Sequence, residues 1–195
     1  MEPELRRQSS QADIRRATAE DISPLRELIR ASVHQLQAAD YSEGQRQNAL
    51  GRIFGVDPAL IEDGTYFVAL SDSRICACGG WSRRATPFGS DRSPARDDRL
   101  LDPERDAARI RALFVHPDYA RRGFGTAILK ACEEAAYAAG FRRAELTATL
   151  TGLKLFRVHG YIWTEEIQIP LGNGEALPVI RMTKELESPE FRRSQ

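Results

Sequence analysis

The sequence predicts an α/β domain in which a sheet of about seven strands is flanked by about four helices. Two observations support this prediction. Segments with helical spacing of apolar residues alternate with short apolar runs of strand type. The 195 residues also suffice for one well-buried core but are too few for two comfortable ones. We therefore expect one domain over 12–184, with the polar segments 1–11 and 186–195 as flexible tails.

The N-terminal part is expected to contain a strand, two helices and a helical turn. Leu25, Ile29 and Val33 recur at helical spacing, and Asp21 and Ser42 are favourable N-caps. The expected elements are a strand over 13–18, helices over 21–37 and 42–54, and a helical turn from Asp57-Pro58 to Gly64.

The rest of the chain is expected to begin and end with a β-hairpin. The first hairpin turns at Ser71-Asp72-Ser73 and the last at Gly172-Asn173-Gly174. Segment 82–106 is polar and has no periodicity, which is typical of a functional or mobile loop. The expected elements are strands over 65–70, 74–81, 108–115, 144–149, 162–169 and 177–183, a helix over 124–140, and a short helix after Thr151.

Charge and hydropathy narrow the range of partners. Lys plus Arg and Asp plus Glu both number 28, so the net charge is zero and no basic field favours nucleic acid or an anionic membrane. No apolar run reaches about 18 residues, and the N-terminus lacks a charged-then-apolar leader. We expect a cytoplasmic protein that binds neither nucleic acid nor membrane.

The cysteines Cys76, Cys78 and Cys132 indicate neither a disulfide framework nor a metal site. Their number is odd, and the pair Cys76 and Cys78 has no further cysteine or histidine nearby in the sequence. A strand over 75–80 would place both on the same face, where they would act as small buried hydrophobic residues. No metal is expected.

The stretch 109–126 carries the strongest functional signal. A strand-like run ends at Val115, a turn follows, and two arginines and two glycines open a helix. The first N–H groups of a helix have no helical partner, and the helix dipole adds partial positive charge. Gly123 and Gly125 can adopt positive φ and let a phosphate approach the backbone. The stretch predicts a site for a phosphorylated ligand, most simply a pyrophosphate.

Two common phosphate loops do not fit this stretch. A Walker loop requires a Gly-Lys pair, and the chain contains none. The dinucleotide fingerprint requires a third glycine where Ile128 stands. A Gly-x-Gly turn by itself is also typical of ordinary helix capping. Further motifs are therefore needed to distinguish a phosphate site from a simple cap.

Two segments together resemble the signatures of the GNAT superfamily of N-acetyltransferases. Ala120-Arg-Arg-Gly123-Phe-Gly125 resembles its acetyl-CoA signature, with Ala120 where Gln or Arg is usual. Leu155-Phe156-Arg-Val-His159-Gly160-Tyr161 resembles its second signature, with Gly160 as the αL helix terminator. Segments 79–84 and 148–155 also resemble an uncharacterised bacterial branch.

The resemblance covers roughly 12–184 and implies the GNAT fold, with a mixed sheet whose strands 109–115 and 144–149 splay apart to hold CoA. It implies a pantetheine arm paired with the first of these strands, where the Val115 N–H faces the thioester oxygen, and a diphosphate on the amides of 122–126. The implied residues that bind acetyl-CoA are Leu113, Phe114, Val115, Arg121, Arg122, Gly123, Phe124, Gly125, Thr126 and Phe156.

The implied activity is direct transfer of an acetyl group from acetyl-CoA to a primary amine. Phe156 stands where many members have a tyrosine that protonates the leaving thiol, so Tyr161 is a substitute by proximity only. His34 and Tyr41 lie where the family builds its acceptor pocket, and an unperturbed histidine has a suitable pKa for a base. For each, a structural role remains the alternative, and water is a further candidate for the base.

The acceptor is expected to be a small-molecule amine. Trp81 is a candidate wall of its pocket, and Arg83 or the adjacent Arg84 a candidate partner of an acidic group. The alternatives are a buried tryptophan followed by a solvated basic turn. Two other functions stay open, namely a non-catalytic acyl-CoA-binding or regulatory module and a protein N-terminal or lysine acetyltransferase. A homodimer is possible because GNAT proteins often pair.

Overall fold

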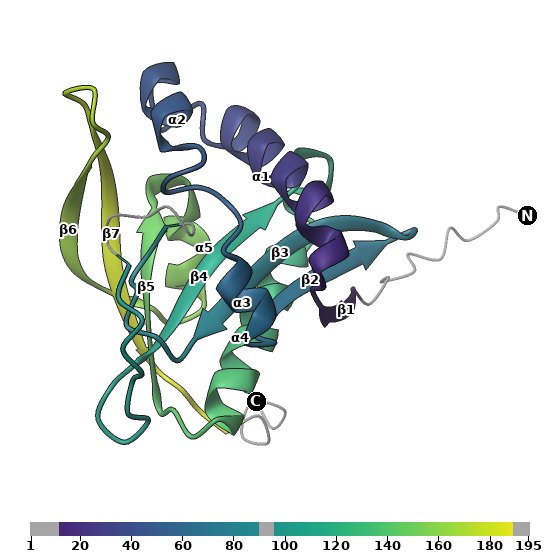
Figure 1. Cartoon of the computed structure of the whole chain (residues 1–195), viewed down its shortest axis with the longest axis vertical. Coiled ribbons are helices and arrows are strands. Elements are labelled where there is room, and N and C mark those ends of the chain that lie inside the picture. Colours follow the sequence, from purple (N-terminus) through teal and green to yellow (C-terminus); the bar gives the residue numbers. More distant parts are fainter. Residues whose placement is uncertain (1–11, 90–95, 189–195) are drawn as a thin grey trace, which may run out of the picture.

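The computed structural model describes residues 12–89 and 96–188 and contains one seven-stranded sheet in the order β1-β2-β3-β4-β5-β7-β6. Figure 1 shows helices on both faces of this sheet. The predicted α/β class and the predicted strand number are thereby confirmed. The strands are β1 (Asp13–Arg16), β2 (Tyr66–Ser71), β3 (Arg74–Ser82), β4 (Ala108–Val115), β5 (Arg143–Thr149), β6 (Ile162–Pro170) and β7 (Ala176–Glu185).

The helices form two layers, one on each face of the sheet (Figure 1). Apolar residues of α1, α2 and α3 pack in one core cluster, and those of α4 and α5 pack in the other. None of the helices within the described ranges is long and apolar enough to cross a membrane. The helices are α1 (Ile22–Leu36), α2 (Glu43–Ala49), α3 (Pro58–Glu62), α4 (Phe124–Ala138) and α5 (Leu153–Val158), with short 3-10 turns at Ala19–Asp21, Pro117–Tyr119 and Leu150–Gly152.

The pairing of β4 with β5 is the only parallel one in the sheet and is very short. Three pairs join the strands, from Ala108 with Ala144 to Ile110 with Leu146. Beyond Ile110 and Leu146 the strands diverge, although β4 continues to Val115 and β5 to Thr149. The central strands therefore splay apart, as the family resemblance implied.

A bulge in β4 lies at the start of this divergence. The pairs Cys78–Phe114 and Gly80–Arg111 leave two β4 residues opposite one residue of β3, and Ala112 has a φ of 52°. The buried hydroxyl of Tyr66 donates to Ala112 O at 3.2 Å. Burial raises the pKa of the Tyr66 phenol well above its usual value, so the hydroxyl keeps its proton and holds the bulge.

The glycines at the end of β3 serve packing on both faces of the sheet. A Cβ on Gly79 would lie 2.6 Å from Ile128 Cγ2 of α4, and one on Gly80 would lie 2.8 Å from Tyr66 Cδ2. Both contacts are shorter than packed carbon atoms allow. The Gly-Gly pair in segment 79–84 is thus explained by close packing of the sheet against α4 and against Tyr66.

The prediction that Cys76 and Cys78 share a face of the sheet is wrong. Cys76 packs in the cluster beneath α4, whereas Cys78 packs in the cluster beneath α1. The pairs Ala69–Ala77 and Leu70–Ile75 leave Cys76 as an extra residue in β3. Such a bulge shifts the two-residue alternation of the strand, and the sequence showed no sign of it.

Two expected boundaries also differ from the structure. The helix expected over 42–54 ends at Ala49, because Leu50 is extended and Gly51 has a φ of 80°. The expected N-terminal tail, 1–11, lies outside the described residues, and so do residues 189–195 of the expected C-terminal tail, 186–195. Leu186 belongs to the expected C-terminal tail, yet it is buried and its N–H donates to Arg142 O at 2.8 Å.

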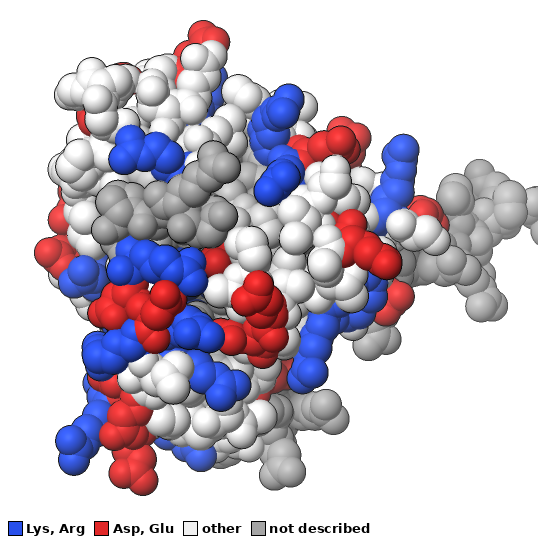
Figure 2. All heavy atoms as spheres, in the orientation of Figure 1, with Lys and Arg blue, Asp and Glu red and all other residues white. Residues whose placement is uncertain are grey.

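Charges of both signs are intermixed on the face shown in Figure 2. Around the loop that precedes β4, Arg99 lies 3.9 Å from Asp106, and Arg105 lies 3.8 Å from Asp102. Exposed pairs of this kind contribute little to stability, at most about 1 kcal/mol each. They divide the surface into small areas of alternating charge.

Tyr41 links the helical layer to the sheet at the splayed end. Its side chain is 3% exposed, its hydroxyl donates to Pro178 O at 2.8 Å, and it accepts from Leu150 N at 2.8 Å. Burial raises the pKa of this phenol to about 12. The hydroxyl therefore satisfies two backbone groups, one in β7 and one just after β5.

We expect Tyr41→Phe to lower the free energy of unfolding by about 2 kcal/mol at neutral pH, because it leaves two backbone groups without partners. Urea unfolding measures this change. The loss should shrink above pH 10, since the unfolded tyrosine ionises near 10 while the folded one keeps its proton to about 12.

Tyr137→Phe is the matched control, because the Tyr137 ring stacks on Arg142 and its hydroxyl has no hydrogen-bond partner within 12–89 and 96–188. Its effect should stay within about 0.5 kcal/mol. Equal losses in the two variants would contradict the role given to Tyr41.

Candidate functional site

A cavity of about 110 Å³ lies where β4 and β5 diverge. Its walls come from both core clusters, with Phe54 and Phe114 from the α1 side and Leu146 and Phe156 from the α4 side. The cavity thus extends through the plane of the sheet. Its lining residues are Gln37, Ile53, Phe54, Pro87, Phe88, Gly89, Ile110, Arg111, Ala112, Leu113, Phe114, Leu146, Thr147, Thr149, Gly152, Leu155, Phe156, Ile169 and Val179.

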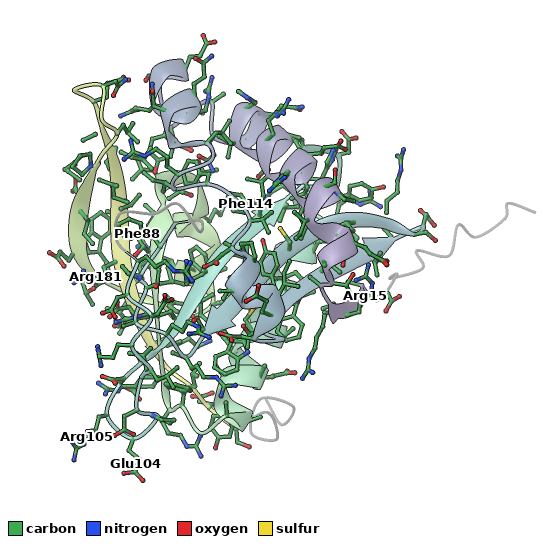
Figure 3. The ribbon with its side chains drawn as sticks, viewed as in Figure 1. Arg15, Phe88, Glu104, Arg105, Phe114 and Arg181 are labelled. Atoms are coloured by element: carbon green, nitrogen blue, oxygen red, sulfur yellow. The ribbon has the colours of Figure 1, made fainter. Side chains whose placement is uncertain are left out.

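Most of this wall is apolar. Figure 3 labels two of its aromatic residues, Phe88 from the loop after β3 and Phe114 from β4. Phe114 packs edge to face against Phe54, with ring centroids 6.0 Å apart. An apolar wall with few polar groups is typical of small-molecule sites, in which the polar groups set the orientation of the ligand.

Arg111 is the one charged side chain among the described residues of this wall. Its Nη1 lies 3.0 Å from Asp57 Oδ2, and its Nη2 donates to Gly89 O at 2.7 Å. The side chains of Arg111 and Asp57 are only 3% and 2% exposed. Burial lowers the pKa of the guanidinium, and the Asp57 charge opposes that shift.

The N-terminus of α4 offers unpaired backbone donors. The N–H groups of 121–126 have no acceptor within 12–89 and 96–188, and Gly123 caps the helix without a side-chain bond. Arg121 and Gly123 have φ values of 63° and 89°. Alternation of left-handed and ordinary backbone turns successive N–H groups toward one point and forms an anion-binding nest.

The two glycines of this turn have different roles. Gly123 has positive φ, as predicted. The prediction of positive φ at Gly125 is wrong, because Gly125 lies in the first turn of α4 with ordinary helical backbone. A Cβ on Gly125 would lie 3.3 Å from Val115 Cγ2 and 3.4 Å from Leu155 Cδ2. Gly125 therefore lets α4 begin close against β4 and α5.

Side chains around the turn are ordered by aromatic and polar contacts. The Arg122 guanidinium lies 5.1 Å from the centroid of the Tyr119 ring and 5.9 Å from that of Phe124. Thr126 Oγ1 lies 3.1 Å from His159 Nε2, which ties α4 to the end of α5. The arginine is exposed, so its charge is accessible at the nest.

The geometry of β4 directs the Val115 N–H into the opening. His116 N donates to Cys76 O at 2.8 Å, on the β3 side. Because successive N–H groups of an extended strand point to opposite edges, the Val115 N–H points away from β3. It faces the side where β5 has diverged.

The three residues predicted to be catalytic, His34, Tyr41 and Tyr161, do not line the cavity. Phe156 lines the cavity, whereas Tyr161 lies behind it in the core, with its ring centroid 5.8 Å from that of Phe156. The Tyr41 hydroxyl is held by the two backbone groups described above and is not part of the cavity wall. His34 is exposed on α1, also away from this wall.

Trp81 and Arg83, predicted to bind the acceptor, do not line the cavity either. Trp81 is buried and packs edge to face against Phe141 at 5.9 Å in the cluster beneath α4. Arg83 is exposed, and the adjacent Arg84 pairs with Asp63 at 2.8 Å. Trp81 thus takes the core position that the sequence left as the alternative.

Sequence reasoning missed Gln37 and Arg111 of the cavity wall and Asp57, the buried partner of Arg111. Arg111 had a detectable signal, because it follows Ile110 inside a strand whose other residues are largely apolar. Asp57 was identified only as the start of a helical turn, and it does cap α3 by accepting from Ala59 N at 3.1 Å. Gln37 had no signal, since a polar residue at a helix end is ordinary.

We expect Asp57→Asn to lower the free energy of unfolding by about 3 kcal/mol, because it leaves the Arg111 charge buried without its partner. Asparagine is an equally good N-cap, so the change isolates the charge. The control is Asp63→Asn, which breaks the more exposed pair with Arg84 and should cost at most about 1 kcal/mol. Urea unfolding measures the free energy of unfolding of both variants. Similar losses in the two would contradict a special role for the buried pair of Asp57 and Arg111.

Solved structures share this fold over nearly the whole chain. A GCN5-related N-acetyltransferase (aminotransferase, class-II) from Rhodopseudomonas palustris is 26% identical, with a TM-score of 0.68, over 91% of this chain and 97% of that one. YncA from Salmonella typhimurium, solved with its cofactor acetyl-CoA, is 16% identical, with a TM-score of 0.59, over 90% of this chain and 94% of that one. A ribosomal-protein-alanine N-acetyltransferase from Brucella melitensis is 17% identical, with a TM-score of 0.60, over 89% and 99%.

The sequence comparisons decide the family. No curated protein matches the chain. The sequence model of the acetyltransferase (GNAT) family matches residues 30–161, which include the cavity-lining strands β4 and β5, the N-terminus of α4 and the whole of α5. With more than half of its length matched, the chain belongs to the acetyltransferase (GNAT) family.

Proposed function

We propose that the protein is an N-acetyltransferase that transfers an acetyl group from acetyl-CoA directly to a primary amine of a small molecule. The observation that carries this proposal is the opening between β4 and β5, where three pairs are followed by divergence and a cavity. Gly125 in the first turn of α4 adjoins Leu155 of the cavity wall, so the unpaired amides and the cavity are neighbours.

The chain offers complementary groups along the length of acetyl-CoA. The nest at 121–126 suits the diphosphate, with the charges of Arg121 and Arg122 beside it. The open edge of β4 at Leu113, Phe114 and Val115 suits the amide-containing pantetheine arm. The Salmonella typhimurium structure that shares the fold contains acetyl-CoA, which supports this assignment.

The reaction requires one new bond and one broken bond. The amine lone pair forms the N–C bond, the thioester C–S bond breaks, sulfur leaves with the electron pair, and nitrogen loses a proton to water. The Val115 N–H points into the opening and would donate to the carbonyl oxygen as that oxygen gains negative charge. A preorganised backbone donor in a largely apolar cavity supplies this stabilisation without reorganisation.

The leaving sulfur does not require a protein acid. Phe156 lines the cavity at the expected acid position and has no proton to donate. A thiol has a pKa of about 8.5, so a thiolate is a stable enough leaving group to depart and take a proton from water. We therefore assign Phe156 to contact with the cofactor and give Tyr161 no catalytic step.

Two alternative functions differ from this proposal, one because it lacks catalysis and the other because its acceptor is a protein. Phe156 in place of an acid also suits a non-catalytic module that binds acyl-CoA. The fold shared with the Brucella melitensis ribosomal-protein-alanine N-acetyltransferase suits an enzyme that acetylates protein N-termini. The small apolar cavity favours a small molecule, which we treat as the main proposal.

We expect the protein to release CoA thiol from acetyl-CoA when an amine is added, and Gly125→Val to raise the Kd for CoA at least about tenfold. The branched side chain would push α4 away from Val115 and Leu155 and distort the nest. Calorimetry measures the Kd, and a thiol reagent measures turnover.

Ala138→Val, at the exposed far end of α4, is the matched control and should leave the Kd unchanged. Tight CoA binding without turnover of any amine in a broad panel would favour the non-catalytic alternative. An unchanged Kd in Gly125→Val would refute the diphosphate assignment.

We expect kcat/KM to rise about tenfold per pH unit between about pH 7 and 9 and to level off near the pKa of the free amine, about 10. The apolar wall and the Arg111 guanidinium disfavour an ammonium ion, so the amine binds in its neutral form. Initial rates at low amine concentration measure this profile. A plateau already below pH 7 would show that a protein group removes the proton.

A further inference from the structure

The cavity wall contains a buried amide without a complete set of partners. Gln37 follows the last residue of α1, is 4% exposed and lines the cavity. Its Oε1 has no hydrogen-bond donor among the parts of the chain that the structure describes. The large majority of buried polar groups in proteins are paired, because a buried carbonyl without a donor loses the hydrogen bonds that it makes in water. The missing partner of Gln37 Oε1 is explained if a bound ligand supplies the hydrogen-bond donor.

The rest of the wall restricts the shape and polarity of that ligand. The polar side chains besides Gln37 in the described part of the wall are Arg111, Thr147 and Thr149, and Thr149 Oγ1 already accepts from Gly152 N at 3.2 Å. The volume of about 110 Å³ is well below that of drug-sized sites. The side chains that would touch the body of a ligand are Ile53, Phe54, Phe88, Phe114, Ile169 and Val179.

The charges beside the cavity disfavour a ligand with a second cation. Asp57 is the carboxylate that contacts the charged wall residue Arg111, and its Oδ2 is paired with that guanidinium. Its Oδ1 accepts from Ala59 N at 3.1 Å and lies 3.5 Å from Arg96 Nη1. A further ammonium group would find no carboxylate in the described part of the wall and would face the Arg111 charge.

The same pair disfavours an acidic ligand. The Nη atoms of Arg111 already bind Asp57 and Gly89 O, and its Nε lacks a partner among the described residues. A carboxylate would have to displace a buried partner or accept from Nε beside the Asp57 charge. Either arrangement buries a second carboxylate against a single guanidinium, so one negative charge lacks a full partner. A neutral, apolar body avoids both penalties.

We propose that the acceptor is a small apolar monoamine, one N–H of which donates to Gln37 Oε1; this rests on the proposed acetyltransferase function. A neutral primary amine has two N–H donors and one lone pair. A bond from one N–H to the amide oxygen leaves the lone pair free to attack the thioester. Gln37 is thereby a specificity-determining residue that completes its own hydrogen bonding only when the acceptor is bound.

The first test compares acceptors of different charge at equal concentration. The panel contains 2-phenylethylamine, spermidine, L-glutamate and a short peptide with a free N-terminal alanine, and thiol release gives kcat/KM for each. We expect kcat/KM for 2-phenylethylamine to exceed that for each of the other three at least about tenfold. A preference for spermidine, glutamate or the peptide overturns the inference, while turnover itself upholds the acetyltransferase function.

The second test separates recognition from structure. Gln37→Met keeps an unbranched side chain of similar length and removes the unpaired amide. It should lower kcat/KM for 2-phenylethylamine about tenfold, yet leave the urea midpoint unchanged or raised, because the free protein loses an unsatisfied group. Gln35→Met, at an exposed position of α1, is the matched control and should change neither quantity.

The remaining outcomes are equally decisive. A lower urea midpoint in Gln37→Met, with Gln35→Met unchanged, assigns Gln37 a structural bond and overturns the inference. If no amine is turned over, the proposed function fails, and calorimetry of 2-phenylethylamine with CoA-loaded protein judges the inference separately. Binding that Gln37→Met weakens about tenfold upholds the amine site, and absent or unaltered binding overturns it.

Discussion

The short parallel ladder between β4 and β5 is the constraint on which the candidate site depends. Three pairs hold the strands together, and the bulge at Ala112 then turns β4 away from β5 while its ladder with β3 continues. The Tyr66 hydroxyl fixes that bulge through Ala112 O. An open strand edge presents backbone groups that require partners, and a ligand with amide groups of its own can supply them. The cavity and the free Val115 N–H both follow from this interruption of the sheet.

The electrostatics of the cavity come from one buried pair set among apolar side chains. Asp57 caps α3 and binds Arg111, which projects from β4, so a single carboxylate joins a helix to the splayed strand. Burial of both charges is costly, and their mutual contact offsets that cost only while both remain in place. Beside this pair, Gln37 of the wall has a buried amide oxygen, Oε1, that accepts no hydrogen bond from the described residues. The wall thus combines a buried ion pair with an unpaired amide oxygen, and the proposed preference among amines rests on this combination.

Periodicity and glycine chemistry predicted most of the fold, whereas the residues assigned to acetyl-CoA came from the family resemblance and stay a prediction. Seven strands, the long helices and positive φ at Gly123 and Gly160 were all readable from local patterns. The bulges at Cys76 and Ala112 were not readable, because an extra residue in one strand is defined only by the register of its partner. The sequence left two positions open for Trp81 for a related reason: an aromatic residue at a strand end looks the same whether it faces a cavity or, as here, Phe141 in the core.

The sequence by itself determined that this chain forms one α/β sheet domain and that a glycine-rich turn starts a helix suited to bind an anion, since both follow from residues close in the chain. Tertiary structure alone decided which polar side chains face the cavity. The wall residues Gln37 and Arg111 come from a helix end and a strand, and Asp57, which pairs with Arg111, caps another helix. Only the packing of α1 and α3 against β4 brings them together. Contacts between residues distant in the chain depend on register and packing, and these are properties of the whole fold that no local pattern contains.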